Sequence, residues 1–91
     1  MTYSTSDIVE KIELASAKAP VGSIWLHFKS GCYIVTGHSL DTENGATLIS
    51  YRRIGGPGFN AIDEAKVVFS RPVLSWFSKN DAGVDRFTRI S

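Results

Sequence analysis

The sequence predicts a mainly β fold, a small antiparallel barrel or sheet of about five strands preceded by one α-helix. Three observations favour this class. Apolar residues near the N-terminus recur at helical spacing, short segments of alternating apolar and polar residues follow, and turn signals separate those segments. The turn signals include Asn44-Gly45 and the GGPG of residues 55–58. A chain of 91 residues has the length of one domain, so residues 1–91 are expected to fold as a single unit.

The helix is expected over residues 6–19. Ser6 or Asp7 can cap its start, and an acid in the first turn suits the positive end of the helix dipole. Pro20 should end the helix, because a residue that precedes proline avoids the α conformation. The apolar residues that share one helical face are Ile8, Ile12, Ala15 and Ala19.

The β-structure is expected over the remaining residues, 23–90. A tight turn over residues 29–32 separates the first two strands, with Gly31 able to take a positive φ. Residues 59–65 can hold one helical turn, and residues 71–77 predict a short turn or 3₁₀ segment. The expected strands are residues 24–29, 32–40, 46–54, 66–70 and 86–90.

The charge balance narrows the classes of partner. Ten lysines and arginines stand against nine acids, a formal net charge of +1, whereas a duplex-DNA binder usually carries a strong basic excess. A small anionic ligand needs only a few well-placed cations. The expected partner is therefore a small phosphate-bearing ligand or another protein, and not duplex DNA.

Cysteine content and hydropathy indicate the compartment. The single cysteine, Cys32, excludes an intrachain disulfide and a cysteine-based zinc site, and it fits a reducing environment. No apolar run approaches the roughly 20 residues of a membrane span, and residues 1–11 lack the basic and apolar regions of a signal peptide. A cytoplasmic protein without a membrane partner is expected. Because so small a domain buries a limited fraction of its surface, a homo-oligomer is also expected.

The first predicted strand carries the main indication of function. Side chains alternate between the two faces of a strand, and we expect one face to be core: Ile24, Leu26 and Phe28. The opposite face is then expected to point outward: Trp25, His27 and Lys29. In the third predicted strand, Tyr51 and Arg53 share a face and would extend this patch if the two strands lie close together.

An aromatic ring beside cations is what a nucleotide-like ligand needs. The ring stacks on a base, which contributes roughly 1–3 kcal/mol per base on single strands. The cations bind phosphate through charge-assisted hydrogen bonds. The alternative is a sheet surface made of good strand formers and solvated by histidine and lysine. The residues alone leave both interpretations open.

Two further segments have ligand-binding potential. Arg71 lies just before the rigid Pro72, where it can hold either an anion or a buried ion pair that fastens the turn. The residues expected in the core behind it are Trp76 and Phe77. The loop at residues 55–58 lacks the Lys-Ser/Thr of a P-loop. Its amides around Gly56 form either an anion nest or a flexible connection. The candidate ligand-binding residues are Trp25, His27, Lys29, His38, Tyr51, Arg52, Arg53, Gly56 and Arg71.

Catalytic and metal-binding chemistry is less well supported. Cys32 and His27 flank a tight turn, but no third residue that could orient a base is apparent. The two histidines, His27 and His38, combine with Asp41 or Glu43 in no known metal-ligand spacing. No catalytic residue, metal site or cofactor is therefore assigned.

An ordered set of short motifs resembles a known family. The segments WLHFKSGCYIVTGHSLDTENGATLISYRRI, RPVLSWF and RFTRI resemble a small bacterial and phage domain of unknown function, number sixteen fifty-three in its series. The resemblance covers roughly residues 23–90 and implies an SH3-like β-barrel, with no established activity. The chain departs from that pattern in a longer segment between Arg53 and Arg71, in Phe69 where a tryptophan is usual, and in the added helix. The matching residues are His27, Lys29, Gly31, Tyr33, Val35, Gly37, His38, Ser39, Gly45, Tyr51, Arg52, Arg71, Pro72, Arg86 and Phe87.

These features favour a non-enzymatic binding module for a small anionic aromatic ligand. A nucleotide or nucleotide-derived signal is the obvious class, and a phage protein that sequesters such a signal fits the resemblance. Trp25 or Tyr51 would stack on the ring, and the histidines would add hydrogen bonds. The phosphate would be held by Lys29, Arg52, Arg53 and Arg71. The alternative is an SH3-like module that binds a protein or peptide through the same aromatics. A small hydrolase with a histidine base is a third possibility.

Overall fold

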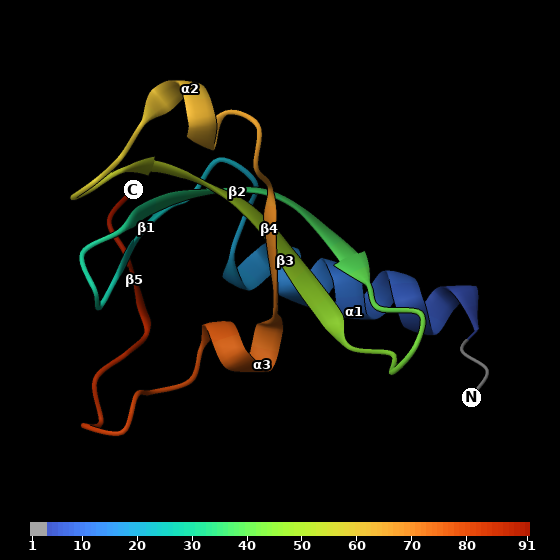
Figure 1. The fold of residues 1–91 in the computed structure, drawn as a ribbon. Coiled ribbons are helices and arrows are strands. Elements are labelled where there is room, and N and C mark those ends of the chain that lie inside the picture. The colour runs from blue at the N-terminus through green and yellow to red at the C-terminus, as the bar shows by residue number, and fades with distance from the viewer. Residues whose placement is uncertain (1–3) are drawn as a thin grey trace.

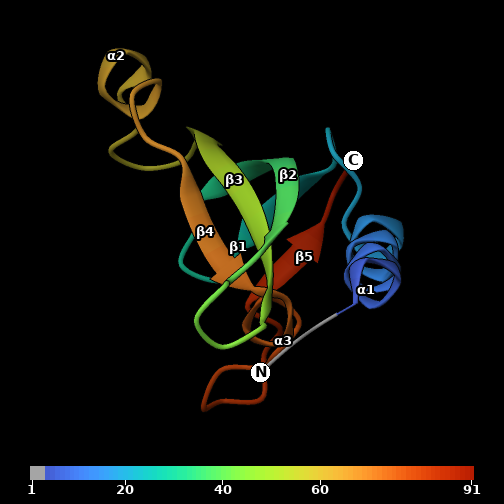
Figure 2. The same cartoon turned by 90° about the vertical axis from the view of Figure 1, so that its right-hand side faces the viewer.

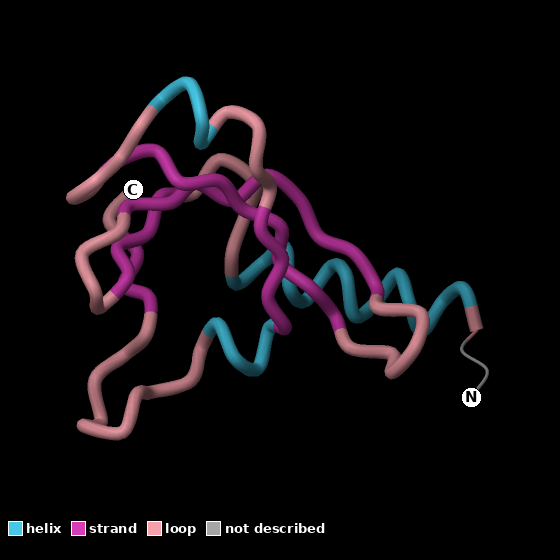
Figure 3. Tube along the Cα trace, viewed as in Figure 1, coloured by secondary structure: helices cyan, strands magenta, loops and turns pink. Residues whose placement is uncertain are grey.

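A computed structural model describes residues 4–91 of the chain (Figures 1 and 3). One helix precedes three successive strands, and two short helices then alternate with the last two strands. The elements are α1 (Thr5–Lys18), β1 (Ile24–His27), β2 (Cys32–Leu40), β3 (Thr47–Gly55), α2 (Ala61–Glu64), β4 (Phe69–Pro72), α3 (Val73–Trp76) and β5 (Phe87–Arg89).

The five strands form one antiparallel sheet in the order β4-β3-β2-β1-β5. The predicted class, mainly β with an N-terminal helix, is confirmed. A closed barrel is not confirmed, because the outer strands β4 and β5 do not pair with each other within the described residues. The sheet instead arches over α3, and α2 lies on the far side of the sheet from α3 (Figures 1 and 2).

Helix α1 packs through the face that its sequence predicted. Ala15 and the capping residue Ala19 are buried. The helix starts one residue earlier than expected, and its N-cap is Ser4, whose hydroxyl accepts a hydrogen bond from the Asp7 N–H at 3.2 Å. Ser4 therefore performs the role predicted for Ser6 or Asp7, satisfying a donor that the first turn leaves without a helical partner.

The core lies on the opposite face of β1 from the one expected. Trp25 is 6% exposed, whereas Leu26 is 42% and Phe28 36% exposed. The indole N–H of Trp25 donates to the Ser23 hydroxyl at 2.8 Å, so this buried N–H group has a hydrogen-bond partner. The prediction of an outward Trp25 is wrong because the sheet bends toward its face, where α1 and α3 contribute to the same core. That core is formed by Ala19, Trp25, Val35, Ile49, Tyr51, Trp76 and Phe87.

Trp76 is the centre of this core. It is fully buried, as predicted, and its ring stacks on Phe87 with centroids 3.8 Å apart. Its neighbour Phe77 was also expected inside but is 40% exposed. The reason is that only one side of the four-residue helix α3 faces the sheet, and Trp76 occupies it.

Several boundaries and turns differ from the prediction. Strand β1 ends at His27, and the residue with positive φ in the following turn is Ser30, at 77°, not Gly31. A Cβ at Gly31 would lie 2.6 Å from the Tyr33 ring, so a larger residue there would force that side chain to shift. Strand β4 begins at Phe69 rather than at residue 66, so that Arg71 lies within a strand.

Candidate functional site

Four basic side chains gather at the end of the arched sheet that holds β1 and β5. We call them the cationic cluster: His27, Lys29, Arg71 and Arg86. His27 ends β1 and pairs across the sheet with Phe87 of β5. The Arg71 guanidinium lies over the same Phe87 ring, 5.2 Å from its centroid. His27, Lys29 and Arg71 were predicted from the sequence as ligand-binding residues. Arg86 was not, and it lies beside them because the sheet bends.

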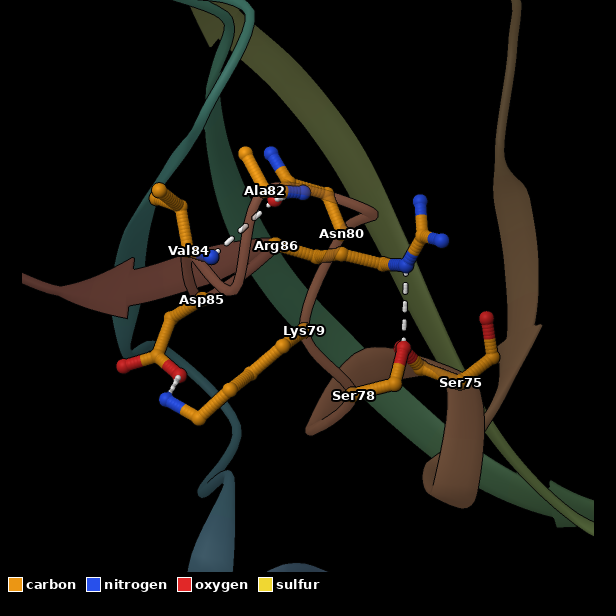
Figure 4. A network of polar contacts seen from close by, with 8 residues as sticks. All are labelled: Ser75, Ser78, Lys79, Asn80, Ala82, Val84, Asp85 and Arg86. Atoms are coloured by element: carbon orange, nitrogen blue, oxygen red, sulfur yellow. Dashed lines mark hydrogen bonds and ion pairs between the residues drawn. The ribbon is translucent and has the colours of Figure 1, made fainter.

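The two arginines of the cluster are positioned by serines at the end of α3. An Nη of Arg71 donates to the Ser75 hydroxyl at 3.3 Å. Nε of Arg86 donates to the Ser78 hydroxyl at 2.9 Å, as Figure 4 shows. The Ser78 hydroxyl donates in turn to the Ser75 carbonyl at 2.6 Å. A guanidinium carries five N–H donors, so most donors of each arginine remain for another acceptor.

The cluster has no carboxylate partner within residues 4–91. The ion pairs of this part of the chain are Arg53 with Glu64 at 3.6 Å and Lys79 with Asp85 at 2.9 Å, and neither includes a cluster residue. Like charges that are held together without a counter-ion repel one another. The arrangement therefore favours an anion supplied from outside.

His27 is the member whose ionisation responds to this environment. Its ring lies 4.5 Å from that of Phe28 and 4.9 Å from that of Phe87, measured between centroids. Burial lowers the pKa of His27, and the charges of Arg71, Lys29 and Arg86 lower it further. Its Nδ1 accepts the Lys29 N–H at 3.2 Å. The imidazole is therefore neutral at pH 7, and Nε2 carries the ring proton as a donor.

An open hollow of about 410 Å³ adjoins the cluster, between the β1–β2 turn and the loop that precedes β5. Its lining consists of Phe28, Lys29, Asn80, Asp81, Ala82 and Arg86. The loop is held in shape by Asn80, whose side-chain oxygen accepts the N–H groups of Ala82 and Val84 (Figure 4). Phe28 contributes a partly exposed aromatic ring, and Asp81 is the one acid of this lining.

The structure places the predicted aromatic residues in the core. Trp25 and Tyr51 are 6% and 7% exposed, so neither presents a ring face to solvent. Tyr51 stacks on Phe69, with centroids 5.5 Å apart, and also packs edge-on against Trp76. Both therefore leave the set of candidate ligand-stacking residues.

The other predicted cations hold structural positions. Arg52 donates to the Ala65 carbonyl at 2.7 Å. Arg53 donates to the carbonyls of Gly55 and Pro57 and pairs with Glu64, so the two arginines fasten α2 to the end of β3. This location follows from the long segment after β3, which folds back beside the strand that it leaves.

His38 and Gly56 also have structural explanations. Nε2 of His38 is 2.6 Å from the Ala19 carbonyl, which ties β2 to the end of α1. Gly56 has a φ of 106°, and a Cβ there would meet the Ser30 carbonyl oxygen at 2.5 Å. The glycine lets the end of β3 approach the β1–β2 turn closely, and this contact explains its presence without a ligand.

Sequence reasoning missed Phe28, Ser75, Ser78 and Arg86 as site residues. Arg86 could have been found, because it stands in the terminal Arg-Phe pair of the family resemblance. Phe28 was assigned to the core because the apolar face of β1 was taken as the inner one. The serines have no signal in the sequence, since their role depends on where the two arginines lie.

The residues considered for catalysis do not come together. Cys32 pairs with Leu26 in the register of β1 and β2, on the face opposite to His27. Within residues 4–91, no three histidine, cysteine or acidic side chains gather as metal ligands do. The described chain also holds no helix with the length and apolar character needed to cross a membrane.

Comparison with known protein families, with curated proteins and with solved structures finds no match for this chain.

Proposed function

We propose that the protein is a non-enzymatic binding module for a small anionic aromatic ligand, a nucleotide or nucleotide-derived signal. The observation that carries this proposal is the cationic cluster, which has no carboxylate partner in the described chain and lies beside the exposed ring of Phe28. A phosphate in the hollow would receive hydrogen bonds from Arg86 and Lys29, and the charge of Arg71, which acts on His27 together with theirs, would add to the attraction for the anion.

The aromatic part of the ligand would stack on Phe28, which replaces Trp25 in this role. Phe28 and Arg86 both line the hollow, so one ligand can use a ring and a cation there. A base stacked on an aromatic side chain gains roughly 1–3 kcal/mol. This combination favours a nucleotide over inorganic phosphate, which would use the cations alone.

The contacts of the site support binding of a ligand without chemical change. A general base needs a partner that orients it. His27 uses Nδ1 for the Lys29 backbone N–H instead of a carboxylate, and Cys32 lies on the other face of the sheet. These contacts suit recognition and sequestration of a ligand better than hydrolysis.

The SH3-like barrel and the family resemblance remain part of this proposal. Five antiparallel strands in one strongly bent sheet support the SH3-like arrangement, whereas the family resemblance rests on the sequence motifs alone. The alternative function, a module that binds a peptide, would use the exposed aromatics Phe28 and Phe69 without requiring the arginines.

Thermal shift assays with nucleoside monophosphates and cyclic dinucleotides test the proposal. A ligand at about 100 times its dissociation constant adds about 2.7 kcal/mol to the free energy of unfolding, which for a domain of this size raises Tm by several degrees. Arg86→Ala should weaken binding by at least about tenfold, because a hydrogen bond to a charged group contributes about 1.5–3 kcal/mol. Arg89→Ala is the matched control, since Arg89 lies on β5 but outside the cluster.

Three outcomes would contradict the proposal. Equal loss of affinity in the Arg86 and Arg89 variants would remove the cluster from the site. The absence of any shift with phosphate-bearing compounds would favour the peptide-binding alternative. Recovery of a chemically altered ligand would show that the protein is an enzyme.

A further inference from the structure

A second surface feature shares no residue with the cationic cluster, and it is independent of the proposed function. It is a groove of about 320 Å³ between α1, the β2–β3 turn and α3. Its apolar lining includes Leu14 and Leu74, which are 59% and 88% exposed. Leucines this exposed on both sides of one groove are typical of a surface that another protein covers. The residues that line the groove are Lys11, Leu14, Ala15, Lys18, Gly45, Ala46, Thr47, Pro72, Val73 and Leu74.

The side of α1 that borders the groove is a regular stripe. Lys11, Leu14 and Lys18 line the groove, and Asp7 precedes them by one helical turn. Spacings of four, three and four residues keep all four side chains on one side of a helix. Among residues 4–91, Asp7 forms no ion pair within 4 Å. The ammonium of Lys18 lies over the Phe77 ring, 5.8 Å from its centroid, and this contact leaves its N–H donors available.

This stripe is complementary to itself when two copies run antiparallel. A two-fold axis midway along the stripe places Asp7 of one copy opposite Lys18 of the other, and the reverse pair forms at the far end. The same axis places Lys11 opposite Leu14, where the aliphatic stem of the lysine covers the leucine. Acid at the start and base at the end of each helix also oppose favourably when the helix dipoles are antiparallel.

We propose that this groove is the interface of a homodimer in which the α1 helices of two copies pack antiparallel. Leu74 stands on the opposite wall of the groove from Leu14, so each Leu74 covers the partner's helix and the apolar centre is buried between the two copies. The self-complementary charges select a second copy over an unrelated partner, because a C₂ interface must match its own surface. No side chain of the cationic cluster lines the groove, although β4 and α3 contribute residues to both, so the cluster stays open in this dimer.

Charge reversal with sedimentation velocity tests the dimer. The wild-type protein should change from monomer to dimer between about 1 μM and about 1 mM, the range of weak association. Asp7→Lys and Lys18→Asp should each weaken self-association by at least about tenfold, because each leaves like charges opposed at both ends. An equimolar mixture of these two variants should restore a dimer, since every opposed pair is then again of opposite sign.

Controls separate this interface from a general loss of structure. Glu13→Lys makes the same charge change as Asp7→Lys on the other side of α1, and it should still dimerise. Leu74→Glu changes a side chain that is 88% exposed in one copy, so it should fold normally but remain monomeric. A wild-type protein that stays monomeric at about 1 mM, or a mixture of the two variants that fails to associate, would overturn the proposal. So would a dimer that survives Leu74→Glu.

Discussion

His27 lies between two phenylalanine rings and beside three cationic side chains, and its pKa is lowered first by burial and then by those charges. The sequence predicted His27 and Lys29 as neighbours on one face, and the charge of Lys29 does act on His27 in the structure. The sequence did not predict the neutral state, which depends on Phe87, Arg71 and Arg86, residues far along the chain that the bent sheet brings near. An anion bound among these cations would reduce the repulsion between their charges. It would also favour the protonated form of His27.

The pH dependence of His27 follows from the sign of its shift. The unfolded chain has a pKa near 6.5, and the folded value is lower, so the unfolded state binds more protons between the two values. The neutral imidazole therefore contributes stability in full above pH 6.5, and this contribution is lost as the pH falls below that value. His27→Gln should reduce the dependence of the free energy of unfolding on pH, measured by denaturant titration at several pH values. His38→Gln is the matched variant, in which a histidine outside the cationic cluster is replaced in the same way.

Ligand binding should move the titration of His27 in the opposite direction. A bound phosphodiester, whose own charge does not change near neutral pH, should raise the pKa of His27, so that affinity increases as the pH falls. NMR titration of the His27 ring with and without a cyclic dinucleotide measures this. An unchanged midpoint in the saturated protein would contradict a site at the cluster.

Local sequence patterns predicted the range of a helix or strand correctly where one face of the element is more apolar than the other. Helix α1 and strands β2 and β3 match their predicted ranges within one residue, because helical spacing and the Asn44-Gly45 turn are local properties. Strand β1 could not be oriented, since both of its faces are rich in apolar and aromatic residues. Strand β4 was shifted because Val67 and Val68 resemble strand residues but are exposed.

The contact between the end of β3 and the β1–β2 turn predicts that alanine substitution of two nearby glycines lowers the free energy of unfolding by unequal amounts. Gly58 has a φ of 73°, and a Cβ added there would meet nothing within 4 Å, so Gly58→Ala adds only the left-handed strain, about 1 kcal/mol. Gly56→Ala adds a clash with the Ser30 carbonyl oxygen and should cost about 1–3 kcal/mol more. Denaturant midpoints measure the difference, and equal midpoints would show that this close approach is absent.

For the whole molecule, curvature decides which residues are core and which form the site. The bend turns the Trp25 face inward, where Trp76 of α3 completes the packing at 5.6 Å between ring centroids. The same bend brings Arg71 of β4 near Arg86, which precedes β5 on the far edge of the sheet, with the serines around α3 between them. Strand order alone places β4 and β5 at opposite edges of the sheet, so the curvature of the sheet is the feature that assembles the cluster.

Tryptophan fluorescence checks this packing in solution. Trp25 and Trp76 are 6% and 0% exposed, so iodide should quench the folded protein weakly and the denatured protein strongly. Trp76→Phe isolates the signal of Trp25, and its circular dichroism confirms that the variant folds. Folded-state quenching of Trp25 close to the denatured value would restore the outward orientation that the sequence predicted.

The sequence by itself determined the class of the fold, most element ranges, the one-sided helix α1 and three of the four basic residues that meet in the cluster. These follow from interactions between residues near each other in the chain, which leave a periodic pattern. Only the tertiary structure decided which face of the sheet is buried, which arginines are committed to α2, and how Arg86 joins the cluster. The physical reason is that each face of β1 carries a large side chain whose burial is favourable, Ile24 and Leu26 on one face and Trp25 on the other. The choice between them depends on the bending of the whole sheet and on the helices that cover it.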